Sequence, residues 1–299
     1  MDEKHTSGEV RREISIVIPT VGRTILRQCL GSIAEGSILP GTLVVVDQSS
    51  NTEIATWLEI LREAGVNIQY VPSSETGKAS AVNRGIERTR SEFIAFTDDD
   101  CLVAKDWLEK MLGHLKHDPS MVVTGEVEAG GDGQIPFVVS YSSPAIYRQP
   151  RLKFDTLSGG NYGVSRGALE RIGLLDEDLV LRWAEDNEWA YRALRSGVPI
   201  KYAPDVIVCH YGWRDSEQSR DQYRNYAMSC GGFYGKYLRR GDWFIGARAG
   251  VHYLRELRRF IKATLTGNTQ HREMSRACLR WLVPGILAGL RSTRAVSAD

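Results

Sequence analysis

Three consecutive carboxylates at the end of an apolar segment are the residues of this chain whose chemistry is easiest to interpret. Residues 92–97 are rich in aromatic and β-branched side chains, which predicts a buried strand, and Asp98, Asp99 and Asp100 follow it directly. Adjacent negative charges repel one another, and a hard divalent cation with oxygen ligands stabilises them. Because open α/β sheets bind ligands at the carboxyl ends of their strands, we predict a metal-assisted site here. The alternative is a solvated acidic turn.

Two further acidic motifs could do chemistry. Asp47 follows the apolar run Val-Val-Val, where a carboxylate can contact a sugar hydroxyl or a base imide, or form an Asx turn or helix cap. Glu185 and Asp186 begin a predicted helix, whose dipole stabilises negative charge. A functional interpretation makes Asp186 a general base for an incoming hydroxyl, with Trp183 stacking on a sugar ring.

Basic and imidazole groups accompany these acids. The block 76–85, which contains Lys78 and Asn83, combines small residues with two cations near a helix start, a pattern suited to phosphate but also typical of a surface helix. It is not a Walker A motif. His210 follows another predicted strand, and Trp213 lies three residues later. A lone histidine is more often structural, yet a metal at Asp100 would have room for an imidazole.

Alternating strands and helices must position these residues. The alternation over residues 14–125 predicts a parallel sheet with right-handed crossovers. Residues 130–160 predict a long loop, and after residue 214 only helices are expected, broken near 231–232, 240–242 and 267–268. The expected strands are 14–19, 42–47, 67–71, 92–97, 122–128, 200–203 and 206–210. Order is expected to resume at 161–165, and the expected helices are 23–35, 52–64, 77–90, 105–117, 166–172 and 185–196.

Composition is that of an ordinary soluble globular protein, with 42% hydrophobic and 25% charged residues. The five cysteines are scattered without a CxxC pair, which predicts reduced thiols. Residues 1–13 are polar and lack the apolar core of a signal peptide, and no apolar stretch is long enough to span a bilayer. We therefore expect a cytoplasmic protein.

Charge is unevenly distributed along the chain. Residues 236–294 carry thirteen Lys or Arg against three Asp or Glu, a net charge of +10, while the whole chain is only +1. Basic side chains interleaved with apolar ones over 254–262 predict an amphipathic helix. This region could contact an anionic membrane surface, form a homodimer or pack on the rest of the chain. Nucleic-acid binding is disfavoured because no such motif is present and the remaining chain is acidic.

Taken in order, the motifs resemble those of family 2 glycosyltransferases, which have the GT-A fold. The resemblance runs from residue 14 to about 213. It rests on Ile-Ser-Ile-Val-Ile-Pro-Thr, Val-Val-Asp-Gln-Ser-Ser, Gly-Lys-Ala-Ser-Ala-Val-Asn-Arg-Gly-Ile, Phe-Thr-Asp-Asp-Asp-Cys, Ser-Gly-Gly-Asn-Tyr-Gly-Val-Ser-Arg, Ala-Glu-Asp-Asn-Glu-Trp-Ala-Tyr-Arg and Val-Cys-His. It implies an α/β GT-A domain at 14–214, between a polar extension at 1–13 and a basic helical region at 215–299.

The resemblance also implies an inverting transfer from a nucleotide-diphospho-sugar, with a UDP-sugar expected, to an acceptor hydroxyl of a glycoconjugate. Asp186 is the implied general base, and Asp100 with His210 the implied ligands of Mg²⁺ or Mn²⁺. Asp98 is expected near the ribose. Lipid-linked acceptors are frequent in the family, which favours peripheral contact with the inner face of a membrane. The remaining implied donor contacts are Pro19, Thr20, Asp47, Lys78, Asn83, Asp99 and Asn161, and the implied acceptor rim is Trp183, Glu185 and Trp213.

Two departures from the family pattern matter. Gln48 stands where a second acid is common, and the middle position of the acidic motif is Asp99, so the metal-binding pair could shift by one residue. Two other functions remain open. A nucleotidyltransferase would normally show a glycine-rich loop after its first strand, where residues 19–23 contain one glycine. A non-catalytic sugar-binding relative need not retain the acid, base and histidine together.

Overall fold

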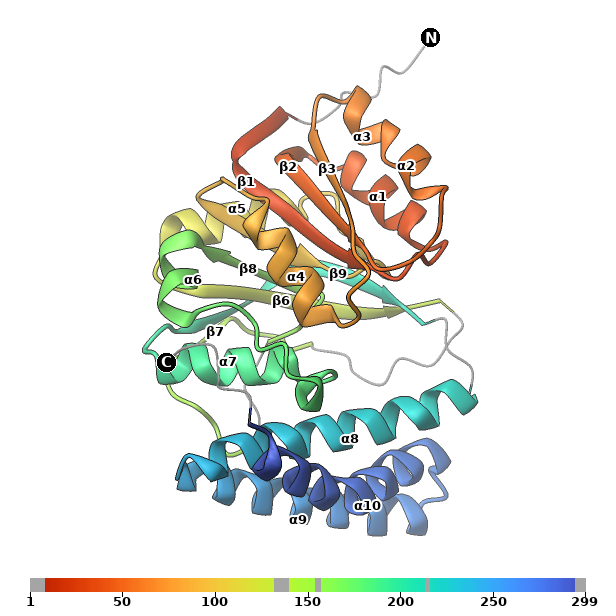
Figure 1. The fold of residues 1–299 in the computed structure, drawn as a ribbon, viewed down its shortest axis with the longest axis vertical. Coiled ribbons are helices and arrows are strands. Elements are labelled where there is room, and N and C mark those ends of the chain that lie inside the picture. Colours follow the sequence, from red (N-terminus) through yellow and green to blue (C-terminus); the bar gives the residue numbers. More distant parts are fainter. Residues whose placement is uncertain (1–8, 132–139, 154–156, 213–215, 294–299) are drawn as a thin grey trace.

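One mixed sheet forms the centre of the protein (Figure 1). The computed structural model describes residues 9–131, 140–153, 157–212 and 216–293. The sheet has nine strands. Eight follow the order β3-β2-β1-β4-β8-β6-β9-β5, and the ninth, β7, pairs with β9. The strands are β1 (Glu9–Thr20), β2 (Ile38–Asp47), β3 (Asn67–Pro72), β4 (Phe93–Thr97), β5 (Cys101–Val103), β6 (Val122–Gly130), β7 (Ala145–Tyr147), β8 (Asn161–Ser165) and β9 (Ile200–Tyr211).

The first half of the sheet is parallel, as the alternating pattern predicts. Strands β3, β2, β1 and β4 pair in parallel, so β1 and β4 end at the same edge, where the acidic motif begins. The expectation of a parallel sheet concerned residues 14–125, and β8, which lies beyond that range, runs antiparallel to both β4 and β6. The two strands expected at 200–203 and 206–210 form the single strand β9, whose pairing with β6 shifts between Gly125 and Glu126.

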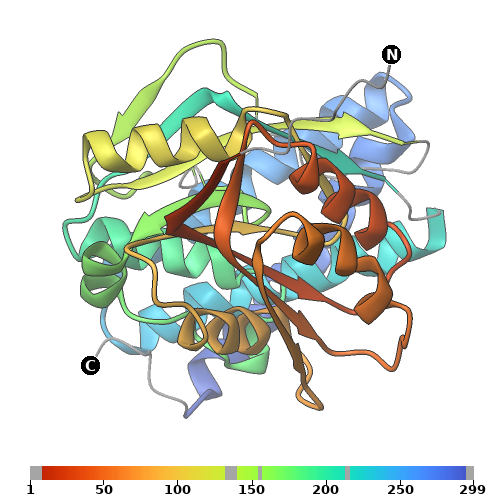
Figure 2. The ribbon, with the colours of Figure 1, turned by 90° about the horizontal axis from the view of Figure 1, so that it is seen from above.

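Helices cover both faces of the sheet and create two apolar cores (Figure 2). Helices α1, α2, α3 and α5 pack on one face, and α4, α6 and α7 on the other. The helix expected at 52–64 is two short helices, α2 and α3. The bounds are α1 (Leu26–Ala34), α2 (Ile54–Trp57), α3 (Glu59–Glu63), α4 (Lys78–Glu87), α5 (Trp107–His117), α6 (Arg166–Ile172), the 3₁₀ helix η1 (Leu179–Leu181) and α7 (Glu185–Arg195).

Three long helices form a further layer beneath α7 (Figure 1). They are α8 (Ser216–Arg239), α9 (Trp243–Leu265) and α10 (Thr269–Arg291), and they share a third apolar core with Leu181 and Tyr191. The expected breaks near 240–242 and 267–268 are confirmed. In the part of the chain that the structure describes, no helix has both the length and the apolar character needed to cross a bilayer.

The break expected at Gly231-Gly232 is wrong, because α8 runs through both glycines. Gly231 and the later Gly235 let α10 approach closely, while Gly232 lies against Val180 of η1. A Cβ atom on Gly231 would lie 2.2 Å from the Leu282 carbonyl oxygen, and one on Gly235 would lie 2.1 Å from the Ile286 carbonyl oxygen. Glycine permits backbones to meet at distances that a side chain would forbid. These glycines therefore serve helix packing rather than helix termination.

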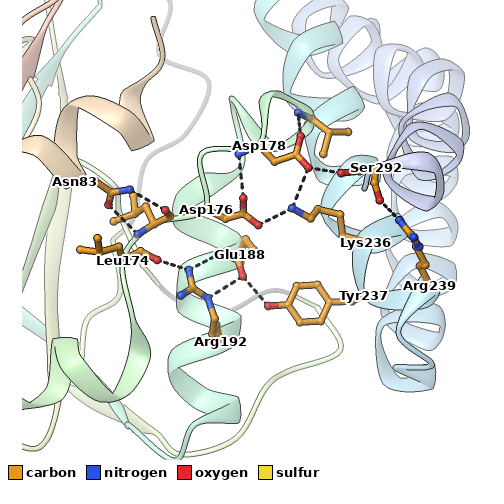
Figure 3. Close-up of polar contacts among 12 residues, drawn as sticks. Asn83, Leu174, Asp176, Asp178, Glu188, Arg192, Lys236, Tyr237, Arg239 and Ser292 are labelled. Atoms are coloured by element: carbon orange, nitrogen blue, oxygen red, sulfur yellow. Dashed lines mark hydrogen bonds and ion pairs between the residues drawn. The ribbon is translucent and has the colours of Figure 1, made fainter. Parts of the chain in front are cut away.

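A buried polar network joins α7 to α8 (Figure 3). The fully buried Glu188 carboxylate accepts hydrogen bonds from Arg192 Nε at 3.0 Å and from the Tyr237 hydroxyl at 2.6 Å. The Lys236 ammonium donates to Asp176 at 2.6 Å. Removing one partner of such a buried pair typically costs about 3–5 kcal/mol, because the other charge is left uncompensated. Glu188 therefore has a structural role, and the network fixes the helix that begins with Glu185 and Asp186.

Candidate active site

A cavity of about 1050 Å³ lies between the carboxyl edge of the sheet and the helices α7 to α10. On the sheet side it is lined by Pro19 and Thr20 at the end of β1, the acidic motif after β4, and His210 near the end of β9. Small-molecule sites usually have about 300–1,000 Å³, so this cavity has room for two substrates. Its position is the one expected for ligands of an open α/β sheet.

The first two carboxylates of the acidic motif have different partners. The Lys78 ammonium lies 2.6 Å from a carboxylate oxygen of Asp98. Asp99 is buried, accepts a hydrogen bond from the Thr20 hydroxyl at 2.7 Å and forms an ion pair with Arg23. Burial raises the pKa of Asp99, and the Arg23 guanidinium opposes this shift. Asp99 thus anchors the motif to the end of β1, while Asp98 lies at the cavity surface.

The third carboxylate lies against a histidine and forms a candidate metal site. Strand pairing aligns Cys101 with His210, and this register brings His210 Nε2 to 3.3 Å from Asp100 Oδ1. The potential ligand atoms of Asp100, Cys101 and His210 lie within 4.8 Å of one another. Burial raises the pKa of the Cys101 thiol well above its usual value, and a thiolate is a soft ligand that Mn²⁺ and Mg²⁺ do not favour. A carboxylate oxygen and an imidazole nitrogen remain, a donor set that fits Mn²⁺ or Mg²⁺.

Asp186 faces the acidic motif from the first turn of α7. One of its oxygens, Oδ1, accepts hydrogen bonds from the Asn187 backbone N–H at 2.7 Å and from the Asn187 side chain at 3.0 Å. Its other oxygen is directed toward Gly159 and Lys78, because a Cβ atom on Gly159 would lie 2.8 Å from Oδ2 and 3.0 Å from the Lys78 nitrogen. Burial raises the pKa of Asp186, and the Lys78 charge opposes the shift. The arrangement suits a carboxylate that accepts a proton.

Glu185 and Lys78 complete this group of charges. Glu185 is buried, and its Oε2 atom has no hydrogen-bond partner among the described residues. Burial, and then the neighbouring Asp186 charge, raise the pKa of Glu185. Burial opposes the charge on Lys78, but Asp98, Glu185 and Asp186 outweigh that effect and raise the pKa of Lys78 well above its usual value. One fixed cation therefore links the acidic motif to the start of α7.

Ten of the residues predicted for the site line this cavity. They are Pro19, Thr20, Lys78, Asp98, Asp99, Asp100, Trp183, Glu185, Asp186 and His210. Trp213 lies outside the described residues. Asp47 lies beside the lining residue Gln48 but is itself buried, where it accepts hydrogen bonds from Ser49 and from the Tyr70 hydroxyl at 2.6 Å. Its contact with a nucleoside stays a prediction.

Two predicted donor contacts require correction. The Asn161 amide donates to the Glu126 and Val206 carbonyls at 2.8 and 2.9 Å, and its oxygen accepts from the Trp107 indole at 2.8 Å. Asn83 bonds through both amide atoms to the backbone of Leu175. Both side chains are buried and absent from the cavity lining. Their amides hold strands and a loop together, so their positions do not support the predicted contact with the donor.

Sequence reasoning missed the cavity wall that the last three helices supply. Gln222, Tyr226, Cys230 and Tyr234 of α8 all line the cavity at intervals of four residues. The Tyr226 ring lies 5.5 Å from the Trp183 ring in an edge-on arrangement. The four-residue period was the available signal, and it indicates only one face of a helix. Nothing local tells whether such a face covers a core or a cavity.

Comparison with characterised proteins finds similar sequences among glycosyltransferases of several kinds. The chain is 24% identical over 213 residues to the pre-mycofactocin glycosyltransferase of Mycobacterium tuberculosis, a match covering 68% of the chain and 44% of that protein. The chain thus spans less than half the length of this relative. It is 23% identical over 218 residues to glycosyltransferase AglE of Haloferax volcanii, covering 71% of each protein.

Solved structures share the fold. The mannosyltransferase PcManGT from Pyrobaculum calidifontis, in complex with GDP-Man and Mn²⁺, superposes with a TM-score of 0.62 at 18% identity, over 97% of this chain and 90% of that one. Residues 1–349 of S. aureus TarS, in complex with UDP-GlcNAc, give a TM-score of 0.58 at 16% identity, over 89% and 91% of the chains. The fold is therefore the expected GT-A fold. The glycosyl transferase family 2 profile matches residues 15–173, more than half of the sequence, and the chain belongs to that family of glycosyltransferases.

Proposed function

We propose that this glycosyltransferase is metal-dependent and inverting, and that it transfers a sugar from a nucleotide-diphospho-sugar to an acceptor hydroxyl of a glycoconjugate. A UDP-sugar is the first donor to test. One observation carries the proposal: a single cavity holds a strand-end carboxylate beside a histidine on one wall and Asp186 on the facing wall. A carboxylate and a histidine for a metal, together with a separate base, are groups that can serve a metal-assisted single displacement.

The acidic motif and His210 form the donor end of the cavity. Asp100 and His210 would hold Mn²⁺ or Mg²⁺, which supplies Lewis-acid stabilisation of the diphosphate leaving group. Asp99 is fixed by Thr20 and Arg23 and keeps the backbone of the motif at the end of β1. Asp98 remains at the cavity surface, available to a ribose hydroxyl, while Lys78 limits the repulsion between its charge and the others.

Asp186 acts at the opposite wall. Its carboxylate accepts the proton of the acceptor hydroxyl as the hydroxyl oxygen bonds to the anomeric carbon. The bond from that carbon to the diphosphate oxygen breaks on the opposite face, so the configuration at the anomeric carbon inverts. Asn187 donates to one oxygen of Asp186 and holds it in place, and the other oxygen points toward Gly159, which lines the cavity. Fixing both substrates in line supplies much of the rate enhancement.

Relatives with bound ligands support the donor class. The PcManGT complex contains GDP-Man and Mn²⁺, and the TarS complex contains UDP-GlcNAc, so the fold accommodates both nucleotide types. A thermal-shift panel of UDP-, GDP-, dTDP- and CDP-sugars, each with and without Mn²⁺, tests the proposal. A ligand at one hundred times its Kd stabilises by about 2.7 kcal/mol, so the true donor should raise the Tm only with the metal. No Mn²⁺-dependent shift with any of them would contradict the proposal.

We also propose that α9 contacts an anionic membrane surface. Four large apolar side chains at helical spacing are exposed on one face of α9. These are Leu254, Leu257, Ile261 and Leu265, with exposed fractions of 59%, 39%, 51% and 82%. The exposed Arg258 lies within this stripe, a combination typical of interfacial helices. The same helix turns Arg255 and Arg259 toward the cavity, so contact with a membrane would leave the cavity lining unobstructed.

Vesicle sedimentation tests the membrane contact. The protein should sediment with anionic vesicles at low salt and detach as the salt concentration rises, because exposed charges are screened. A Leu257→Ser, Ile261→Ser variant should lose this binding. Binding to neutral and anionic vesicles alike, or to neither, would contradict the proposal, and a concentration-dependent dimer that the variant abolishes would identify the stripe as a subunit interface.

A further inference from the structure

The half of the cavity formed by the C-terminal helices is lined by cations. Arg255, Arg259 and Lys262 of α9 line it at intervals of four and three residues, which places them on one face of the helix. Arg182 lines it from the segment that follows η1, and Lys153 from the segment after β7. Five cationic side chains from three separate parts of the chain therefore converge on one region.

One buried acid partly offsets this charge. The Glu256 carboxylate, 3% exposed, accepts hydrogen bonds from Arg255 at 3.1 Å, Arg259 at 2.9 Å and Ser275 at 3.0 Å. One negative charge cannot neutralise five cations, so among the residues that the structure describes this group keeps a net positive charge. Its effect is to fix two guanidinium groups at the cavity wall. Fixed guanidinium groups recognise phosphate and carboxylate oxygens through paired hydrogen bonds.

A neighbouring histidine, His252, is affected by the same positive charges. His252 lines the cavity on α9, and its Nδ1 atom lies 3.0 Å from the Tyr234 hydroxyl. Burial, and then the charges of Arg255 and Arg259, lower the pKa of His252 to about 4. The imidazole is therefore neutral at physiological pH. A neutral imidazole and a tyrosine hydroxyl add hydrogen-bonding groups without adding charge.

The wall formed by α8 retains further hydrogen-bonding capacity. Gln222 and Tyr223 line the cavity and are 3% and 4% exposed. The Gln222 carbonyl oxygen and the Tyr223 hydroxyl have no hydrogen-bond partner in the described part of the chain. Buried polar groups are normally paired, so these two atoms point to a polar occupant. They lie on the same wall as Tyr226, which contacts Trp183.

From these features we infer that the C-terminal half of the cavity binds a phosphate ester carried by the acceptor. The inference rests on the proposed function and names the acceptor class for that site. A phosphate carries a charge of about −1.5 to −2 at neutral pH, which matches several cations better than a single carboxylate does. The metal at Asp100 would serve the donor diphosphate, and the cations of α9 would serve the acceptor phosphate. The acceptor hydroxyl would then lie between these two anchors, beside Asp186.

Binding of phenyl phosphate, measured by titration calorimetry in EDTA, tests the inference. Without a metal, Asp98, Asp100 and Asp186 make the donor half unfavourable for an anion, so the titration reports on the other half. The test variant is Arg259→Gln, Lys262→Gln. Its matched control is Arg276→Gln, Arg291→Gln, which removes the same charge from exposed positions of α10 outside the cavity lining and outside the apolar stripe of α9. Arg255 and Ser275 still hold Glu256 in the test variant, so its Tm should stay near that of the wild type.

We expect the wild type and the control to bind phenyl phosphate with equal affinity and the test variant to bind at least about tenfold more weakly. Benzyl alcohol, which lacks the charge, should not bind. Absence of phenyl phosphate binding to the wild type, or equal weakening in both variants, would overturn the inference. Phosphatidylcholine vesicles that carry a long-chain prenyl phosphate form a second arm. Selective weakening with the vesicles as well as with phenyl phosphate assigns a lipid-borne phosphate, and selective weakening with phenyl phosphate alone assigns a soluble one.

The donor panel separates this inference from the proposed function. If a nucleotide sugar stabilises the wild type with Mn²⁺ but phenyl phosphate does not bind, the proposed function stands and the acceptor class is wrong. If phenyl phosphate binds through Arg259 and Lys262 but no nucleotide sugar stabilises the protein, the anion site is real and the assigned reaction is wrong.

Discussion

Replacing Asp186 with asparagine tests the assignment of the base without disturbing the shape of the site. The Oδ1 atom accepts two hydrogen bonds from Asn187, at 2.7 and 3.0 Å, and an amide oxygen can accept both. The new amide nitrogen would replace the oxygen that lies toward Gly159 and Lys78. The change therefore removes basicity and one negative charge while it keeps the volume and the orienting bonds.

The expected loss follows from the role of a general base. Such a group contributes about 10²–10⁴-fold to the rate, equivalent to about 3–5 kcal/mol of activation free energy. Donor affinity should change less than threefold, because the proposed metal ligands, Asp100 and His210, are left unchanged. The assay is release of nucleoside diphosphate from the donor identified by the thermal-shift panel, with Mn²⁺ present and water in place of the unknown acceptor.

The matched control is Glu185→Gln, the same chemical change one residue away. We expect it to lower turnover less than tenfold, because Asp186 keeps its charge and its bonds to Asn187. The pH dependence gives a second check. Burial raises the pKa of Asp186, so wild-type turnover should rise with pH through that raised pKa, and the Asn variant should lose this rise. Near-normal turnover of Asp186→Asn, with a large loss in Glu185→Gln, would refute the reasoning and make Glu185 the base.

Three other expectations concern the metal, the buried acid and the helix packing. Asp100→Ala should abolish Mn²⁺-dependent stabilisation by the donor while the Tm without ligand stays near wild type; an unchanged Mn²⁺ response would remove Asp100 from the site. Burial raises the pKa of Glu185, so the folded state binds its proton more tightly and this group's contribution to stability falls as pH rises above about 4.5. In thermal unfolding, the Tm of Glu185→Gln should therefore exceed that of the wild type by a margin that grows from pH 5 to pH 8, of the order of 2 °C. A margin that does not depend on pH would contradict the raised pKa of Glu185 as its cause. Gly235→Ala should destabilise the protein by about 1–3 kcal/mol, because its Cβ would lie 2.1 Å from the Ile286 carbonyl oxygen. The control is Gly250→Ala, where the added Cβ has open space around it, and it should stabilise α9 by up to about 1 kcal/mol. Denaturant titration measures both free energies of unfolding, and equal effects of the two substitutions would argue against the close packing of α8 and α10.

Local sequence patterns predicted the parallel half of the sheet and most of the candidate site residues that line the cavity. The apolar run before Asp98 and the helix start at Glu185 are local signals, and parallel pairing brings strand ends to one edge. Family resemblance then joined these segments into one site. The antiparallel direction of β8 was not predicted, because period and composition do not encode strand direction.

Features that depend on contacts between distant segments were not predictable in this way. Gly231 and Gly232 have the composition of a helix break, yet α8 continues through both, and the two glycines are explained only by the distant segments that they meet, α10 and Val180. Asn161 lies in a motif that indicates ligand binding, yet its side-chain amide is fully hydrogen-bonded to three residues that are distant in the sequence. The +10 charge of the C-terminal region was visible, but which of its arginines line the cavity depends on how α9 packs.

The central claim is a single displacement at the anomeric carbon, and the configuration of the first product tests it most directly. The wild type should be incubated with an α-linked nucleotide sugar and Mn²⁺, and the released sugar followed by ¹H NMR before its anomers equilibrate. Attack from the face opposite the diphosphate predicts that the β anomer forms first, and that both metal chelation and Asp186→Asn suppress its formation. An α anomer as the first product would contradict the account.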